Sequence, residues 1–133
     1  MIPNDEMLAI IRELLQGSEP ARKRARAVLW SEVDRYVVYR ANLPIGPLAD
    51  DRDERRNIAL RVMEKLERDD CADLREWEHR QCERRNAAPW WGFVKTVAKH
   101  RAIDHARTSR LNLARRGEPF VWAIIEPLGF LST

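Results

Sequence analysis

The chain has 133 residues, enough for one domain with a hydrophobic core, and its formal net charge is +3. Hydrophobic residues make up 44% and charged residues 34%, an excess of charge that suits helices with broad exposed faces. Two cysteines are too few for a disulfide scaffold or a zinc site, and no apolar run approaches the length of a membrane span. We therefore expect an all-α, cytoplasmic protein in which Cys71 and Cys82 are free thiols.

Basic residues are concentrated in two segments of the chain. Seven Lys and Arg between residues 95 and 116 are opposed by Asp104 alone, and six between residues 20 and 40 are opposed by two acids. This segregation is typical of a surface that meets a polyanion. The alternative is a solvated basic face without a partner.

The first expected helix runs from Asp5 to Gln16, with Asn4 as its N-cap and Gly17 as its end. Its apolar residues recur at helical spacing and predict one buried stripe. These residues are Met7, Leu8, Ile11, Leu14 and Leu15.

A second helix is expected from Ser18 to about Asn42, because Pro20 is tolerated in a first turn. Five of its residues form the expected core face: Val28, Leu29, Val33, Tyr36 and Val37. Two prolines and a glycine between Leu43 and Leu48 then predict a loop.

Asp50 or Asp51 is expected to cap a third helix that reaches about Arg68. A further, heavily charged helix from Asp73 to Arg85 has Leu74 and Trp77 as its apolar anchors. We expect this further helix to be mostly exposed.

The last expected helix begins after Pro89 and runs from Trp90 to about Arg110. It is apolar on two sides, since Val94 and Ile103 lie opposite each other, so it is buried between neighbours or contacts a partner. The apolar tail, residues 118–133, is expected to be a strand, an extended segment packed on the bundle, or an exposed end that binds another chain.

No enzyme motif is present: the sequence has neither a glycine-rich phosphate loop nor a Gly-x-Ser-x-Gly elbow. His100, Asp104 and His105 suggest a metal site, but no further ligand follows at suitable spacing. Pairing of Asp104 with Arg101 or Arg107 is the better explanation. We expect no catalytic residues, no metal and no cofactor.

The aromatic start and basic continuation of the last helix favour nucleic acid as the partner. Indole rings stack on unpaired bases, and neighbouring Lys and Arg neutralise phosphates. For Trp90 a role as a core anchor is an equal alternative.

Residues 89–107 resemble a signature of the extracytoplasmic-function class of bacterial sigma-70 factors, Phe-x-x-Trp-Leu-x-x-Ile-Ala-Arg-Asn-x-x-Ile-Asp-x-x-Arg. Trp90 stands for the Phe and Phe93 for the Trp, in one ungapped window. Four positions match outright: Ala98, Ile103, Asp104 and Arg107. The resemblance covers residues 22–116 and implies a single helical bundle like sigma region 2, as one domain over residues 1–117.

The resemblance implies that the last helix opens promoter DNA at the −10 element and holds the unpaired non-template strand. The residues that it assigns to DNA binding are Trp90, Trp91, Phe93, Lys95, Lys99, His100, Arg101, Arg107 and Arg110.

The resemblance also implies a surface for core RNA polymerase on the third helix, at Asn57, Leu60, Arg61 and Lys65. Relatives have Asp, Gln and Glu where this chain has Asn57, Leu60 and Arg61, which puts docking in doubt. The chain has no counterpart of the helix-turn-helix domain that such factors carry after region 2. It is therefore expected to be a fragment, a stand-alone protein or half of a split factor.

Two functions follow as expectations. The first is a sigma-like transcription factor that binds promoter DNA and core polymerase. The second is a protein-interaction module on the same scaffold, whose tail, residues 118–133, binds a subunit that supplies the missing domain or an anti-sigma factor.

Overall fold

Residues 2–83 and 87–116 are described in the computed structural model, with side chains described as far as residue 109. This part of the chain forms four α-helices and one short 3-10 helix, and it contains no strand. The expected all-α class is confirmed. The tail at residues 118–133 and the side chain of Arg110 lie outside the described residues.

Helix α1 spans Asn4–Gln16 and ends, as expected, at Gly17. A Cβ at Gly17 would lie 2.5 Å from the carbonyl oxygen of Glu13, so only glycine fits this close approach. The expectation that Asn4 caps this helix was wrong. Pro3 occupies the cap position, and its carbonyl accepts the Met7 N–H at 3.0 Å, which leaves the Asn4 side chain available to other elements.

Helix α2 spans Glu19–Tyr39, three residues shorter at its end than expected. Ser18 caps its start by accepting the Ala21 N–H at 3.4 Å. Leu29, Val33 and Val37 are buried as expected, but Val28 is 38% exposed because it lies on the outer face of the helix.

A loop and the 3-10 helix η1, Gly46–Asp50, connect α2 to α3. The Arg55 guanidinium anchors this connection by donating hydrogen bonds to the carbonyls of Val38 at 2.7 Å, Ala49 at 2.9 Å and Ala41. The carbonyls of Val38 and Ala41 lie at or just beyond the end of α2, where a helix leaves its acceptors without partners, and that of Ala49 lies in η1. One distant cation therefore satisfies the end of α2.

Helix α3 spans Arg52–Glu83 and is capped by Asp51, whose Oδ1 accepts the Asp53 and Glu54 N–H groups at 2.9 and 3.3 Å. A non-helical turn at residues 68–71 divides it into a first segment, residues 52–67, and a second segment, residues 72–83. The two expected helices, separated near Arg68, are therefore confirmed.

The turn within α3 places Asp69, Asp70 and Cys71 at φ of 54°, 55° and 60°. Left-handed backbone strains non-glycine residues, so the turn needs support. Arg75 supplies it by donating to the Asp70 carbonyl at 2.8 Å.

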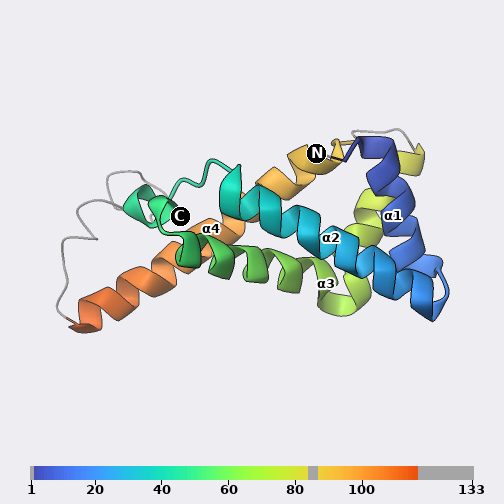
Figure 1. Cartoon of the computed structure of the whole chain (residues 1–133). Helices are drawn as coiled ribbons and strands as arrows, with labels where there is room; N and C mark the ends of the chain where they lie inside the picture. The colour runs from blue at the N-terminus through green and yellow to red at the C-terminus, as the bar shows by residue number, and fades with distance from the viewer. Residues whose placement is uncertain (1, 84–86, 117–133) are drawn as a thin grey trace.

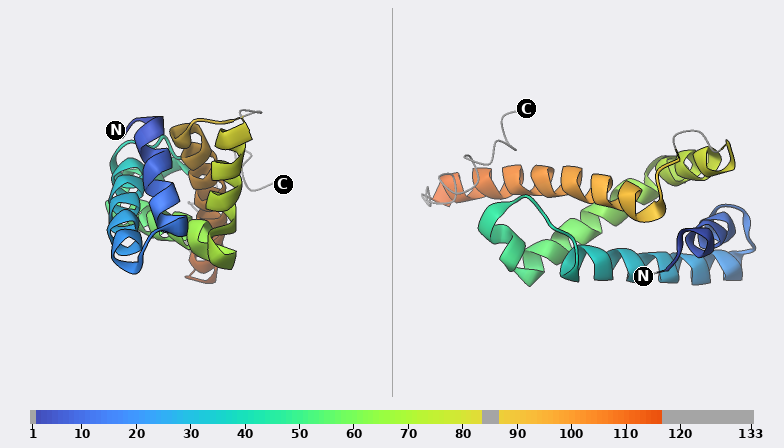
Figure 2. Two further views of the ribbon diagram at one scale, coloured as in Figure 1. Left: turned by 90° about the vertical axis from the view of Figure 1, so that its right-hand side faces the viewer. Right: turned by 90° about the horizontal axis from the view of Figure 1, so that it is seen from above.

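Helix α4 spans Trp90–Arg116 and extends past the rest of the bundle (Figure 1). Seen from above, the first segment of α3 crosses between α2 and α4 (Figure 2, right). Helix α1 and the second segment of α3 lie together at the end of the bundle that contains the start of α2. This arrangement leaves one side of α4 against α3 and the opposite side exposed.

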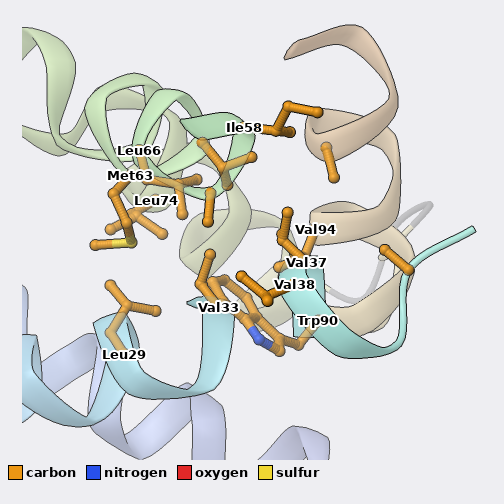
Figure 3. Packing of buried hydrophobic residues seen from close by; sticks show 14 of the residues in the cluster. Leu29, Val33, Val37, Val38, Ile58, Met63, Leu66, Leu74, Trp90 and Val94 are labelled. Carbon is orange, nitrogen blue, oxygen red and sulfur yellow. The ribbon is translucent and has the colours of Figure 1, made fainter. Parts of the chain in front are cut away.

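The core joins all four helices, and Figure 3 shows the part of it that α2, α3 and α4 form. Its fully buried residues include Met7 and Ile11 of α1, then Leu29, Val33, Val37, Ile58, Val62, Leu66, Leu74, Trp90 and Val94 of the later helices. Leu74 and Trp77 anchor the second segment of α3 in the core, and most of its other residues are exposed, as expected.

Candidate nucleic-acid interface

The outward face of α4 carries exposed basic side chains. Lys95 and Lys99 are four residues apart, so they lie on the same face, and both are exposed. His100 is exposed beside them. These three predicted DNA-binding residues are therefore available to a ligand.

Arg101 and Arg107 are less available. Arg101 pairs with Asp104 at 3.1 Å, which confirms the expected ion pair, and its Nε is buried without a hydrogen-bond partner. Arg107 is partly buried. Neither side chain is an open cation like Lys95 or Lys99.

The two tryptophans at the start of α4 are held by the fold. Trp90 is fully buried, and its ring lies 5.2 Å from the Trp77 ring in an edge arrangement. It occupies the core position that the sequence left open as an alternative, and contact with a base would require its ring to leave the core. Trp91 is partly buried, packs 5.0 Å from Tyr36, and donates its indole N–H to the Ile2 carbonyl at 3.2 Å.

Phe93 faces a groove between α4 and the second segment of α3. Its ring stacks on that of Trp77, with centroids 6.3 Å apart and an interplanar angle of 21°. We call this hollow, about 340 Å³ in volume, the aromatic groove. It is lined by Lys65, Asp73, Glu76, Trp77, Arg80, Ala88, Phe93, Val97 and His100.

The charges at the aromatic groove are arranged in pairs. Lys65 lies 3.3 Å from Asp73, and Arg80 lies 2.5 Å from Glu76. Each of these two cations is therefore neutralised by a carboxylate beside it. Lys65 therefore belongs to this groove, whereas the sequence grouped it with the polymerase-facing residues.

The other three residues of that group lie together elsewhere. Asn57, Leu60 and Arg61 line a second hollow, between the first segment of α3 and the later part of α4. We call it the polar groove; its volume is about 610 Å³. Its remaining residues are Glu54, Glu64, His105, Thr108 and Ser109. Leu60 is 47% exposed at its edge.

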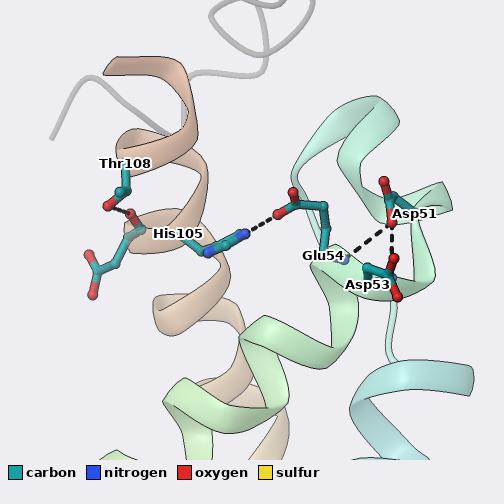
Figure 4. A network of polar contacts seen from close by, with 6 residues as sticks. Asp51, Asp53, Glu54, His105 and Thr108 are labelled. Atoms are coloured by element: carbon teal, nitrogen blue, oxygen red, sulfur yellow. Dashed lines mark hydrogen bonds and ion pairs between the residues drawn. The ribbon is translucent and has the colours of Figure 1, made fainter. Parts of the chain in front are cut away.

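His105 lines the polar groove and points from α4 toward Glu54 of α3 (Figure 4). It is 7% exposed, its Nε2 contacts Glu54 Oε2, and its Nδ1 is buried without a hydrogen-bond partner. His100 lines the aromatic groove instead, so the two histidines serve different hollows. Among the described residues no group of three or more His, Cys, Asp or Glu could hold a metal ion.

Sequence reasoning missed the aromatic groove as a unit and the contact of Glu54 with His105. Trp77 was recognised only as a packing residue, and Glu54 and His105 are separated by 51 residues. No local spacing links such positions, because the pairing depends on how α3 crosses α4. The sequence signal that was available was Trp77 itself, an aromatic residue in an otherwise charged helix.

Comparison with protein families, with curated proteins and with solved structures finds no match. No helix within the described ranges is long and apolar enough to cross a membrane.

Proposed function

We propose that this chain is a sigma-like transcription factor domain that binds the unpaired non-template strand of promoter −10 DNA. The resemblance of residues 89–107 to the sigma-70 signature supports this function. The observation that carries it is the exposed His100 beside the stacked Phe93 and Trp77 rings in one groove, on a helix that also carries the exposed Lys95 and Lys99 on another part of its surface.

In this proposal each part of the interface has a separate role. Lys95 and Lys99 neutralise phosphates, while the partly exposed Phe93 ring, supported by the buried Trp77, offers ring surface to an unstacked base. His100 serves both purposes: its ring nitrogens can donate a hydrogen bond to a phosphate or a base edge, or accept one from a base edge. Trp90 and Trp91 support the site by holding the first turn of α4 in place.

Fluorescence anisotropy with labelled DNA tests the proposal. The chain is titrated against a single-stranded −10-like sequence, a scrambled strand of the same composition and the matching duplex. We expect preference for the single strand, with affinity that falls steeply as salt rises. Equal affinity for the scrambled strand reduces the function to general single-strand binding, and no binding to any of the three contradicts it.

Core RNA polymerase is the proposed protein partner of the same factor. A pull-down compares the unchanged chain with Arg61→Glu, which introduces the acid that the sigma-70 family has at the position that Arg61 resembles. Capture of the unchanged chain supports a working sigma domain. Capture of Arg61→Glu alone supports a sigma-like fold whose docking surface has diverged.

The second candidate function is a protein-interaction module on the same scaffold. Leu60, exposed at the edge of the polar groove beside Arg61, favours it. The partner would be a subunit with a promoter-reading helix-turn-helix domain, or an anti-sigma factor, held also by residues 118–133. Asn57, Leu60 and Arg61 are changed together to Asp, Gln and Glu. If this variant binds polymerase and the unchanged chain does not, divergence of this surface explains why the unchanged chain does not bind.

A further inference from the structure

The Asn4 side chain connects the two walls of the aromatic groove. Its Oδ1 accepts the backbone N–H of Trp90, the first residue of α4, at 2.6 Å. Its Nδ2 donates to Oε1 of Gln81, in the second segment of α3, at 3.2 Å. One carboxamide thus contacts both helices that form the groove.

Further hydrogen bonds tie the same elements together around Asn4. The Ala88 carbonyl, just before α4, accepts the Trp77 indole N–H at 2.9 Å and the Gln81 side-chain amide at 2.7 Å. On the other side the Ile2 carbonyl accepts the Trp91 indole N–H at 3.2 Å. The start of α4 is therefore held by both the beginning of the chain and α3.

The start of α4 needs such a partner for a physical reason. The first N–H groups of a helix have no acceptor within the helix, and a polar side chain just before it normally accepts one. Pro89 precedes Trp90 and has no such side chain. Asn4, which is 86 residues away, performs the capping role instead.

We propose that Asn4 is a positioning residue for the aromatic groove: it sets the separation of Trp77 and Phe93 by fixing α4 against α3. Its effect on DNA rests on the function proposed above. Its effect on the groove does not, because the hydrogen bonds exist without a ligand.

Hydrogen exchange measured by NMR in the full chain directly tests whether the Asn4 side chain holds the start of α4. Asn4→Ala is compared with Asn42→Ala, since Asn42 is an exposed asparagine in the loop after α2. We expect Asn4→Ala to speed exchange of the Trp90 amide about fivefold, the usual effect of a lost cap, and to speed exchange of the Trp77 indole N–H as well. The control leaves both rates unchanged. An unchanged Trp90 rate in Asn4→Ala overturns the proposal.

Binding of a labelled oligothymidine tests the consequence for the site. Measured well below each variant's melting temperature, Asn4→Ala is expected to weaken binding about fivefold. Asn4→Asp is expected to retain most of the affinity, because its carboxylate accepts the Trp90 N–H and suits the positive end of a helix. Equal loss in both variants, or no loss in either, overturns the positioning role. If the unchanged chain fails to bind the oligothymidine, the proposed function fails. The exchange rates still show whether Asn4 holds α4 against α3.

Discussion

The aromatic groove and the polar groove lie between the same two helices, yet different side chains line them. Trp77 and Phe93 stack in the aromatic groove, and its nearby charges are paired. The polar groove has Glu54, Arg61 and Glu64 around the exposed Leu60, with the buried His105 behind them.

The two grooves also differ in how α4 is held. At the aromatic groove, Trp90 enters the core and Asn4 caps the helix. At the polar groove, α4 contributes the small residues Ala102 and Ala106 to the core, together with the contact of His105 with Glu54. At the aromatic groove α4 is therefore held by a large buried ring and a helix cap, whereas at the polar groove the described residues hold it through small core side chains and the contact of His105 with Glu54.

The largest expected difference is in stability. Trp90→Ala should lower the free energy of unfolding by about 3 to 5 kcal/mol, because it empties a fully buried site. His105→Ala should cost about 2 kcal/mol, through the lost contact with a partly exposed Glu54. Urea unfolding followed by circular dichroism measures both. A larger loss of unfolding free energy in His105→Ala than in Trp90→Ala would show that the polar groove contributes more to stability.

The next largest expected difference is in DNA affinity, which should depend on the aromatic groove and not on the polar groove. Phe93→Ala should weaken single-stranded DNA binding by about 1 to 3 kcal/mol, the usual value of one stacked base. Leu60→Ala, an equally simple truncation at the polar groove, should leave DNA affinity unchanged. Anisotropy titrations measure both variants at the same salt. Equal losses would mean that the strand does not distinguish the grooves.

A smaller effect is expected from single cations. Lys99→Ala should reduce the slope of log affinity against log salt by about 0.7, since one phosphate contact to a single strand is lost. Lys23→Ala, which removes an exposed lysine from α2, serves as the control and should not change the slope. A change with Lys23 and none with Lys99 would assign the DNA surface to α2 rather than α4.

The smallest effect concerns the two free thiols. Burial raises the pKa of Cys71, so less of it is thiolate at any given pH than for an ordinary cysteine. Cys82 is exposed at the end of α3. Alkylation by iodoacetamide near pH 8, followed by peptide mass spectrometry, should therefore modify Cys82 first. Faster modification of Cys71 would show that the turn in α3 opens readily.

Much of the fold could be predicted because its signals are local. Apolar residues at helical spacing located the described α-helices, though not the short η1, and Gly17 and Ser18 marked ends that the structure confirms, while Asp51 is the one of the two expected residues that caps α3. Asn4 shows where this reasoning fails. An asparagine before an apolar stripe is typical of a local cap, but its side chain caps a helix that begins 86 residues later.

The candidate site could be predicted only in part. The exposure of Lys95 and Lys99 follows from their position on a basic helix face. The composition of the aromatic groove does not follow from it, because Lys65, Trp77 and Arg80 come from another helix than Phe93 and His100. The four residues predicted to face polymerase lie in two different grooves for the same reason. Lys65 lines the aromatic groove, whereas Asn57 and Leu60 line the polar groove.

The sequence by itself determined the helices, the breaks between them and the basic, aromatic character of α4, because periodicity, caps and composition act over a few residues. Only the tertiary structure decided which tryptophan is buried, that Trp77 and Phe93 share a groove, and that Asn4 holds its walls together. These features depend on the angle at which α3 crosses α4 and on the turn at residues 68–71. Such geometry results from packing the whole core at once.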